Sequence, residues 1–167
     1  DVDSAKWVIT MIPFFTVIFT PLFGALVDKA GKATLWMTIG AGLVLLAHLL
    51  LRYAPQGVPF WGYFSIAILG TGYSLVPSAM WPSVPKIVPE RNLGTAYSLI
   101  YWVQNMGMLI VPVFVGRIFK ISDGVEAACR AEYIFIALGA LAIAVALALS
   151  CTSRKHPELA LDKPCGN

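Results

Sequence analysis

The sequence predicts an all-α integral membrane protein with five transmembrane helices. Of its 167 residues, 58% are hydrophobic and 13% are charged, and the mean hydropathy is +0.76. Soluble domains usually carry about 25% charged residues, and a buried core cannot absorb this much apolar surface. In addition, the charged residues divide the chain into five uncharged windows, each long enough to cross a bilayer, which takes roughly 20 residues.

The expected spans follow the charges and the turn residues in order. The first two flank the short charged link Gly24–Lys32. The third span begins after the turn residues Ala54–Gly57, and it stops before the Pro- and Ser-rich residues that follow Met80. The spans cover residues 7–27, 33–51, 58–80, 92–116 and 133–153, and residues 154–167 form a cytoplasmic tail.

Lysine and arginine counts in the short loops predict the orientation, because cytoplasmic loops carry more of these residues. The bias is small, and it places the link Gly24–Lys32 and the carboxyl terminus in the cytoplasm. One side of the membrane receives Lys29, Lys32, Lys86, Arg91, Arg154, Lys155 and Lys163, and the other receives Lys6, Arg52, Arg117, Lys120 and Arg130.

Prolines separate the expected spans into two kinds. Pro13 and Pro21 interrupt the first span, Pro77 the third and Pro112 the fourth, whereas the second and fifth contain none. Each proline frees a backbone carbonyl that hydrocarbon cannot satisfy, so these helices belong beside protein or a wet cavity. The proline-free spans suit outer positions against lipid. The alternative is that membrane helices simply tolerate these prolines.

A polar and aromatic stripe marks the fourth span. Tyr97, Tyr101, Gln104, Asn105 and Met108 recur at spacings of three and four, so they share one helix face. Amides in hydrocarbon need partners, which either another helix or a wet cavity supplies. We interpret the stripe as part of a substrate cavity. The candidate cavity residues are Tyr73, Trp81, Tyr97, Tyr101, Gln104 and Asn105.

Composition argues against several other classes. A net charge of +3, scattered along the chain, does not suggest nucleic-acid binding. Three cysteines without C-x-x-C spacing indicate neither a disulfide framework nor a zinc site. No catalytic constellation, metal site or cofactor is expected, and His48, alone near the outer end of its span, is interpreted as an interfacial residue. The chain starts at Asp1, so we expect a piece of a longer protein.

Two stretches carry a family resemblance. The link reads G-x-x-x-D-K-x-G-K, and it resembles the loop motif that the major facilitator superfamily carries between spans 2 and 3 and again between spans 8 and 9. Residues 73–116, with S-A-M-W-P-S-V-P, I-V-P-E, L-G-T-A-Y and Q-N-M-G, are similar to the lysosomal dipeptide transporter branch of this superfamily and its microbial relatives. The fourth span is more aromatic than expected for that branch, which leaves another substrate open.

The resemblance implies that the chain is an incomplete six-helix half, spans 8 to 12 of twelve. The two halves of such a transporter rock about a midplane site and give alternating access. The residues of the cytoplasmic gate motif would be Gly24, Asp28, Lys29, Gly31 and Lys32. In the family, the aspartate meets a helix N-terminus of the opposite half, so we expect Asp28 to lack a partner here. The start of the fourth span, Asn92–Thr95, is the expected docking point for the other half's loop.

The predicted function is secondary transport of a small organic solute, and a dipeptide is the favoured substrate. The spans contain no Asp, Glu, Lys or Arg, so ion coupling would reside in the missing spans and a uniporter is plausible. The expected partners are the substrate, the bilayer, the missing N-terminal half and, in a lysosomal membrane, an accessory membrane glycoprotein. A microbial member would lie in the plasma membrane. The alternatives are a carrier of sugars, drugs or organic anions, a membrane enzyme, for which no site is found, and an inactive or accessory fragment.

Overall fold

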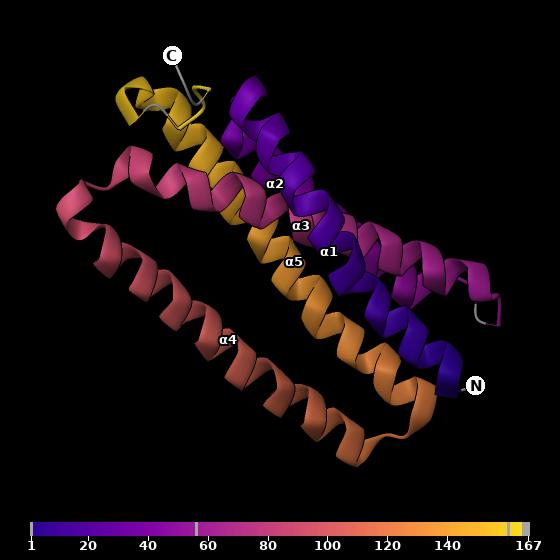
Figure 1. The fold of residues 1–167 in the computed structure, drawn as a ribbon. Coiled ribbons are helices and arrows are strands. Elements are labelled where there is room, and N and C mark those ends of the chain that lie inside the picture. Colours follow the sequence, from indigo (N-terminus) through magenta and orange to yellow (C-terminus); the bar gives the residue numbers. More distant parts are fainter. Residues whose placement is uncertain (1, 56, 160, 165–167) are drawn as a thin grey trace.

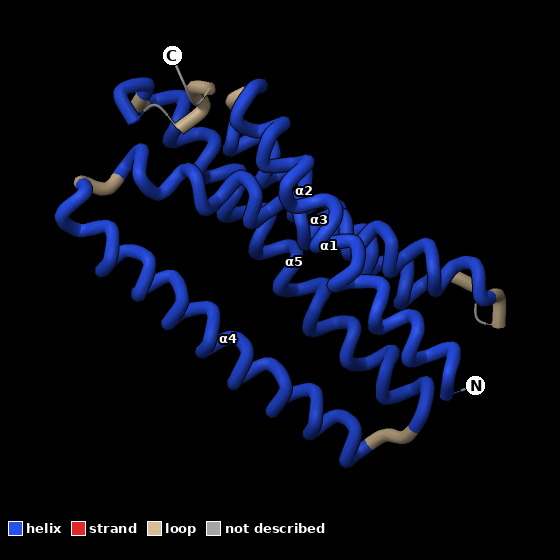
Figure 2. Tube along the Cα trace, in the orientation of Figure 1, coloured by secondary structure: helices blue, strands red, loops and turns tan. Residues whose placement is uncertain are grey.

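The structure, a computed structural model, describes residues 2–55, 57–159 and 161–164, with side chains from residue 10 onward. Five long helices follow one another: α1 (Val2–Ala30), α2 (Ala33–Tyr53), α3 (Pro59–Ile87), α4 (Leu93–Ile121) and α5 (Gly124–Lys155). Short 3₁₀ turns, Glu90–Asn92 and Pro157–Leu159, precede α4 and follow α5. Figure 2 shows helices joined by short loops, and the described ranges contain no strand, which confirms the all-α prediction.

Four of the helices are long and apolar enough to cross a membrane. The segments that meet this description are Thr10–Ala30, Ala33–Tyr53, Glu90–Ile121 and Gly124–Lys155. Helix α3 is absent from this set, although the sequence predicts a span within it. Its glycines, serines and prolines lower its hydropathy, and many of them are buried against neighbouring helices. A helix enclosed by protein needs less apolar surface than one that faces lipid.

Helix α3 also runs past its expected end. We expected the span to stop near Met80, but the helix continues through Pro82 and Pro85 to Ile87. Proline removes one intrahelical hydrogen bond and is tolerated where other groups satisfy the freed carbonyl. Pro85 would free the carbonyl of Trp81, and the hydroxyl of Tyr97 donates to that oxygen at 3.4 Å.

Close packing joins α3 to α1 and α2, and α5 packs against α2. The backbones of α2 and α3 approach at Gly40 and Gly72. A Cβ at Gly40 would lie 2.7 Å from Val76 Cγ2, and one at Gly72 would lie 2.9 Å from the carbonyl oxygen of Gly40. Small residues permit such close approach between membrane helices.

Near residues 30–33 a small hydrophobic core forms from three helices. Val27 of α1, Ala33 and Met37 of α2, and Ala79 of α3 are all buried there. This core fixes the end of α1 and the start of α2. The link between α1 and α2 therefore lies next to well-packed side chains.

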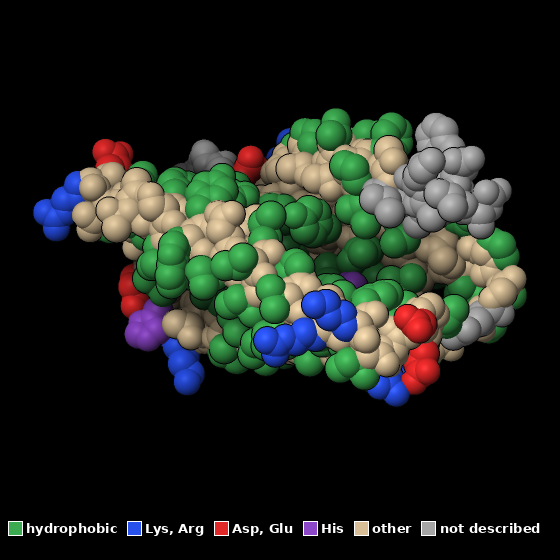
Figure 3. All heavy atoms as spheres, turned by 90° about the horizontal axis from the view of Figure 1, so that it is seen from below, with side chains coloured by type: hydrophobic (Ala, Val, Ile, Leu, Met, Phe, Trp, Pro, Cys, Tyr) green, Lys and Arg blue, Asp and Glu red, His purple; other side chains and the backbone are tan. Residues whose placement is uncertain are grey.

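Helix α4 stands apart from the other four helices (Figure 1). It contains no buried residue along its described length, and only limited contacts join it to α3 and α5. Hydrophobic side chains cover much of the face of the molecule shown in Figure 3. An apolar surface of this extent requires lipid or further helices against it.

Candidate functional site

The link between α1 and α2 is a turn of two residues in left-handed conformation. Gly31 has φ 63° and Lys32 has φ 57°. The Gly31 N–H donates to Val27 O at 2.9 Å, and the Trp36 indole N–H donates to Gly31 O at 3.0 Å. Glycine adopts this conformation without steric cost, whereas lysine does not. The second residue is therefore strained, and neighbouring contacts must hold it in place.

Among the described residues, the Asp28 carboxylate has no hydrogen bond or ion pair, and it is partly exposed. Lys29 and Lys32 extend into solvent. A Cβ added at Gly24 would meet nothing within 4 Å, so packing within this chain does not require a glycine there. The charged residues of the link thus face outward, whereas Gly31 is buried. Their partner in an opposite half stays a prediction.

Three of the six candidate cavity residues come together in a cluster that we name the aromatic corner: Trp81 of α3 with Tyr97 and Tyr101 of α4. The Trp81 ring lies 5.7 Å from the ring of Tyr97 and 5.0 Å from that of Tyr101, between centroids. With the 3.4 Å hydrogen bond from Tyr97 to the Trp81 carbonyl, this corner is the main join between α3 and α4. Aromatic pairs at these distances attract one another beyond their burial.

The remaining candidates do not join the corner. The Asn105 amide donates to the carbonyl oxygen of Tyr101 in its own helix at 2.7 Å, and Asn105 is exposed. Gln104 is exposed on the same helix. Tyr73, on α3, is 56% exposed, and no contact with the other five is seen in the described part of the chain. Within the described residues, the amides therefore take no partner from another helix, and the cavity stays a prediction.

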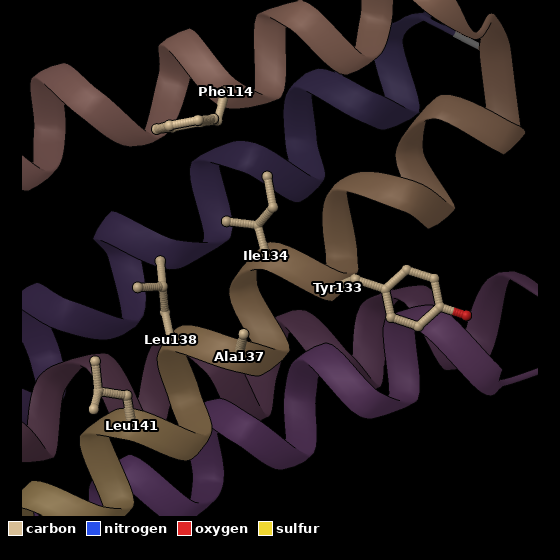
Figure 4. Close-up of a pocket in the computed structure, with 6 residues that line it drawn as sticks. All are labelled: Phe114, Tyr133, Ile134, Ala137, Leu138 and Leu141. Carbon is tan, nitrogen blue, oxygen red and sulfur yellow. The ribbon is translucent and has the colours of Figure 1, made fainter.

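An apolar groove of about 490 Å³ separates α4 from α5 (Figure 4). Phe114 of α4 faces Ile134, Leu138 and Leu141 of α5 across it, and Ala137 and Tyr133 complete the lining. None of the candidate cavity residues lines this groove. Its apolar walls lack the convergent polar groups of a solute site.

Our expectation that His48 stands alone is wrong, whereas its interfacial position stays a prediction. His48 Nδ1 lies 2.7 Å from Glu132 Oε2 of α5, and its ring stacks on Phe135 at 4.9 Å. The predicted fifth span began at residue 133 and so excluded this acid, which lies within α5. The sequence did hold one signal for this pair. Because α2 ends and α5 starts on the same side of the membrane, His48 and Glu132 are expected at similar depth.

The same seam continues to the end of α2. Arg52 donates to the hydroxyl of Tyr133 at 2.8 Å and lies over the rings of Tyr133 and Tyr53 at 4.9 and 5.0 Å. A second pocket of about 390 Å³ adjoins this seam at Glu132 and is lined by the end of α2 and the starts of α3 and α5.

Metal chemistry finds no support in the described ranges, which contain no cluster of three or more His, Cys, Asp or Glu side chains suited to hold an ion. Cys151 is exposed as a free thiol. The ionisable side chains of the bundle instead form pairs or project outward.

Comparison with known proteins identifies the family of the chain. A family model described as Major Facilitator Superfamily matches residues 1–164. The chain is 33% identical over 153 residues to the lysosomal dipeptide transporter MFSD1 of Mus musculus, which covers 91% of this chain and 31% of that protein. It is 32% identical to the proteins of the same name from Danio rerio and Homo sapiens, over 71% and 70% of this chain.

The chain spans between about a quarter and a third of the length of these relatives, at 31%, 25% and 24% of the three proteins. The matched segment includes the link, the aromatic corner and the seam between α2 and α5. The predicted resemblance is therefore confirmed. The chain is a multi-pass integral membrane protein that belongs to the major facilitator superfamily.

Proposed function

We propose that this chain forms the C-terminal part of a secondary transporter that moves dipeptides across the lysosomal membrane by alternating access. Membership of the superfamily supports solute transport, and the relatives named lysosomal dipeptide transporters suggest both the substrate and the organelle. The rest of the transporter, and any accessory membrane glycoprotein in the lysosome, are proposed partners. The activity belongs to the whole protein and not to this chain alone.

The observation that carries the proposal is the exposed stripe of α4 beside the aromatic corner. Tyr101, Gln104 and Asn105 are exposed on a helix that buries nothing within this chain. A dipeptide offers a peptide amide and two charged ends. Side-chain amides match the peptide group, aromatic walls match apolar side chains, and charged clamps for the termini would come from the other half.

Ion coupling is the open part of the mechanism. The sequence places no Asp, Glu, Lys or Arg in the expected spans, yet Glu132 of α5 pairs with His48 of α2. Glu132 is paired with His48 and not with a residue of the α4 stripe. We therefore retain a uniporter as the proposal, and make the proton gradient a variable of the test.

The test is uptake of a labelled dipeptide by the full-length parent protein in proteoliposomes, with and without a proton gradient. The proposal expects uptake without a gradient, and loss of most uptake in the Gln104→Ala, Asn105→Ala double variant. Val103→Ala, at an exposed position on another face of α4, is the matched control. A folded protein that transports a sugar or an organic anion but no dipeptide would reject the substrate and keep the family.

A further inference from the structure

The described end of the carboxyl-terminal tail binds the first turn of α2. The N–H of Lys32 donates to the carbonyl oxygen of Asp162 at 2.8 Å. The N–H of Thr34 donates to Asp162 Oδ1 at 2.9 Å, and the Thr34 hydroxyl lies 2.9 and 3.0 Å from the two carboxylate oxygens. Helix N-termini leave backbone donors unpaired and favour an anion beside them. Asp162 occupies that place from 128 residues away along the chain.

Two further helix ends hold the same segment. The hydroxyl of Ser153, in the last turn of α5, donates to Asp162 Oδ2 at 2.8 Å. The ammonium group of Lys86, in the last turn of α3, donates to the carbonyl oxygen of Lys163 at 2.7 Å. Leu161 is 2% exposed, so apolar packing accompanies the polar contacts. The segment therefore connects α2, α3 and α5 at the end of the bundle that carries the gate motif.

The link is shaped to accept this segment. A Cβ on Gly31 would lie 2.6 Å from the carbonyl oxygen of Asp162 and 2.9 Å from the nitrogen of Pro164. A side chain at this position would therefore displace the tail. Lys32 stands at the N-cap position of α2, yet its side chain makes no capping hydrogen bond. The cap comes instead from the tail, and it is the tail that holds Lys32 in its strained conformation.

We propose that Asp162 is a positioning residue for the Gly24–Lys32 link: its carboxylate caps α2 and holds residues 31 and 32 in the conformation that presents Asp28, Lys29 and Lys32 outward. Without this cap, the strained lysine would relax and the outward face of the link would change. The capping role stands on the contacts above. Its importance in the transport cycle rests on the proposed function.

The first experiment measures amide hydrogen exchange of residues 31–36 in the full-length protein. Asp162→Ala should speed exchange in this segment about tenfold or more, because the amides of Lys32 and Thr34 lose their acceptors or their ordered tail. Glu158→Ala is the matched control, since Glu158 lies on the same tail and its side chain pairs with His156 instead. Equal exchange in wild type and Asp162→Ala would overturn the proposal.

A second variant guards against loss of folding. Ser153→Ala removes one donor to the carboxylate and leaves the carboxylate itself, so it should give a smaller acceleration in the same segment. Asp162→Glu retains the charge and should restore part of the protection. No effect of Ser153→Ala and no recovery with glutamate would also count against the cap.

Transport then separates a gating role from a merely structural one. With a gate that depends on the link, Asp162→Ala should lower kcat threefold or more and leave KM unchanged, because the solute site lies elsewhere. Faster exchange with unchanged kcat would reject the role in the cycle. If wild type moves no dipeptide, the proposed function fails, while the exchange measurement still decides whether Asp162 positions the link.

Discussion

His48 of α2 and Glu132 of α5 form an acid–base pair across the helix seam, with 2.7 Å between Nδ1 and Oε2. Their side chains are only 13% and 19% exposed, so solvent screens the contact less than it screens a surface pair. The imidazole also stacks on Phe135. This seam joins two helices that the sequence treats as plain lipid-facing spans.

We expect the single variants His48→Ala and Glu132→Ala each to destabilise the protein by about 1–3 kcal/mol, because each leaves a partly buried polar group unpaired. The double variant should lower the thermal unfolding midpoint by less than the sum of the two single shifts. Shifts that add completely would show that the two side chains do not act together. The exposed i,i+4 pair Arg130–Glu126 is the control, with a coupling under about 0.5 kcal/mol.

The aromatic corner predicts a kinetic separation between two substitutions of Trp81. Trp81→Ala removes the ring that contacts Tyr97 and Tyr101, so α4 loses its main join to α3 and the proposed cavity wall moves. We expect KM for a dipeptide to rise about tenfold. Trp81→Phe keeps an aromatic ring and should raise KM much less. Initial uptake rates in proteoliposomes measure both, and similar KM values for the two variants would place the corner outside the solute site.

Tyr97→Phe provides a milder test of the same corner. It removes the 3.4 Å hydrogen bond to the Trp81 carbonyl and leaves the ring contact. A bond of this length is weak, so we expect a loss of stability below about 1 kcal/mol. A thermal unfolding scan of the full-length protein measures it. A larger loss would indicate that the carbonyl freed by Pro85 has no other means of satisfaction.

Much of the fold could be predicted because it depends on local signals. Uncharged windows located the helices, and the spacing of Tyr97 and Tyr101 placed both on one face of α4. The end of α3 was missed, since Pro82 and Pro85 predict a break that tertiary hydrogen bonds prevent. Local sequence reports the cost of a proline but does not report the donor on another helix that offsets it.

The tail and the seam could not be predicted for a different reason. Asp162 meets Thr34, and His48 meets Glu132, across more than eighty residues of chain. Neither pair has a characteristic spacing, because helix packing alone brings its members together. By contrast, the gate motif was visible as a local pattern, and its partner in an opposite half stays a prediction. The motif did not indicate which contacts hold the link in place.

The pH dependence of the tail contact follows from the environment of Asp162. Partial burial raises the pKa of this carboxyl, but hydrogen bonds from Thr34 and Ser153 and the charge of Lys86 outweigh burial, and the net pKa is lowered. The folded state therefore binds fewer protons here than the unfolded state, whose aspartates have a pKa of about 3.9. The stabilisation is complete above that value and is lost as the pH falls through the lower, folded value.

The difference in thermal unfolding midpoint between wild type and Asp162→Asn should thus be largest and constant from neutral pH down to about pH 5, and should shrink in more acidic buffer. Glu158→Gln, on the exposed part of the same tail, is the control and should give little difference in thermal stability at any pH. A difference between wild type and Asp162→Asn that grew as the pH fell would contradict the assignment of the ionised carboxylate as the cap.

The crossing of α2 and α3 gives the last prediction, which uses two glycines two residues apart. At Gly40, an added Cβ would meet Val76 Cγ2 at 2.7 Å and the backbone of Gly72 at 3.3 Å, whereas at Gly42 it would meet nothing within 4 Å. Gly40→Ala should push α2 away from α3 and destabilise the protein by about 1–3 kcal/mol.

Gly42→Ala should instead be neutral or stabilising by up to about 1 kcal/mol, because alanine lowers the entropy of the unfolded chain and favours a helix. Thermal unfolding of the two variants in the full-length protein therefore measures shifts of opposite sign. Equal shifts would mean that α2 and α3 do not cross at Gly40. Since α3 contributes Trp81 to the aromatic corner, Gly40→Ala should also weaken dipeptide uptake, while Gly42→Ala should leave it intact.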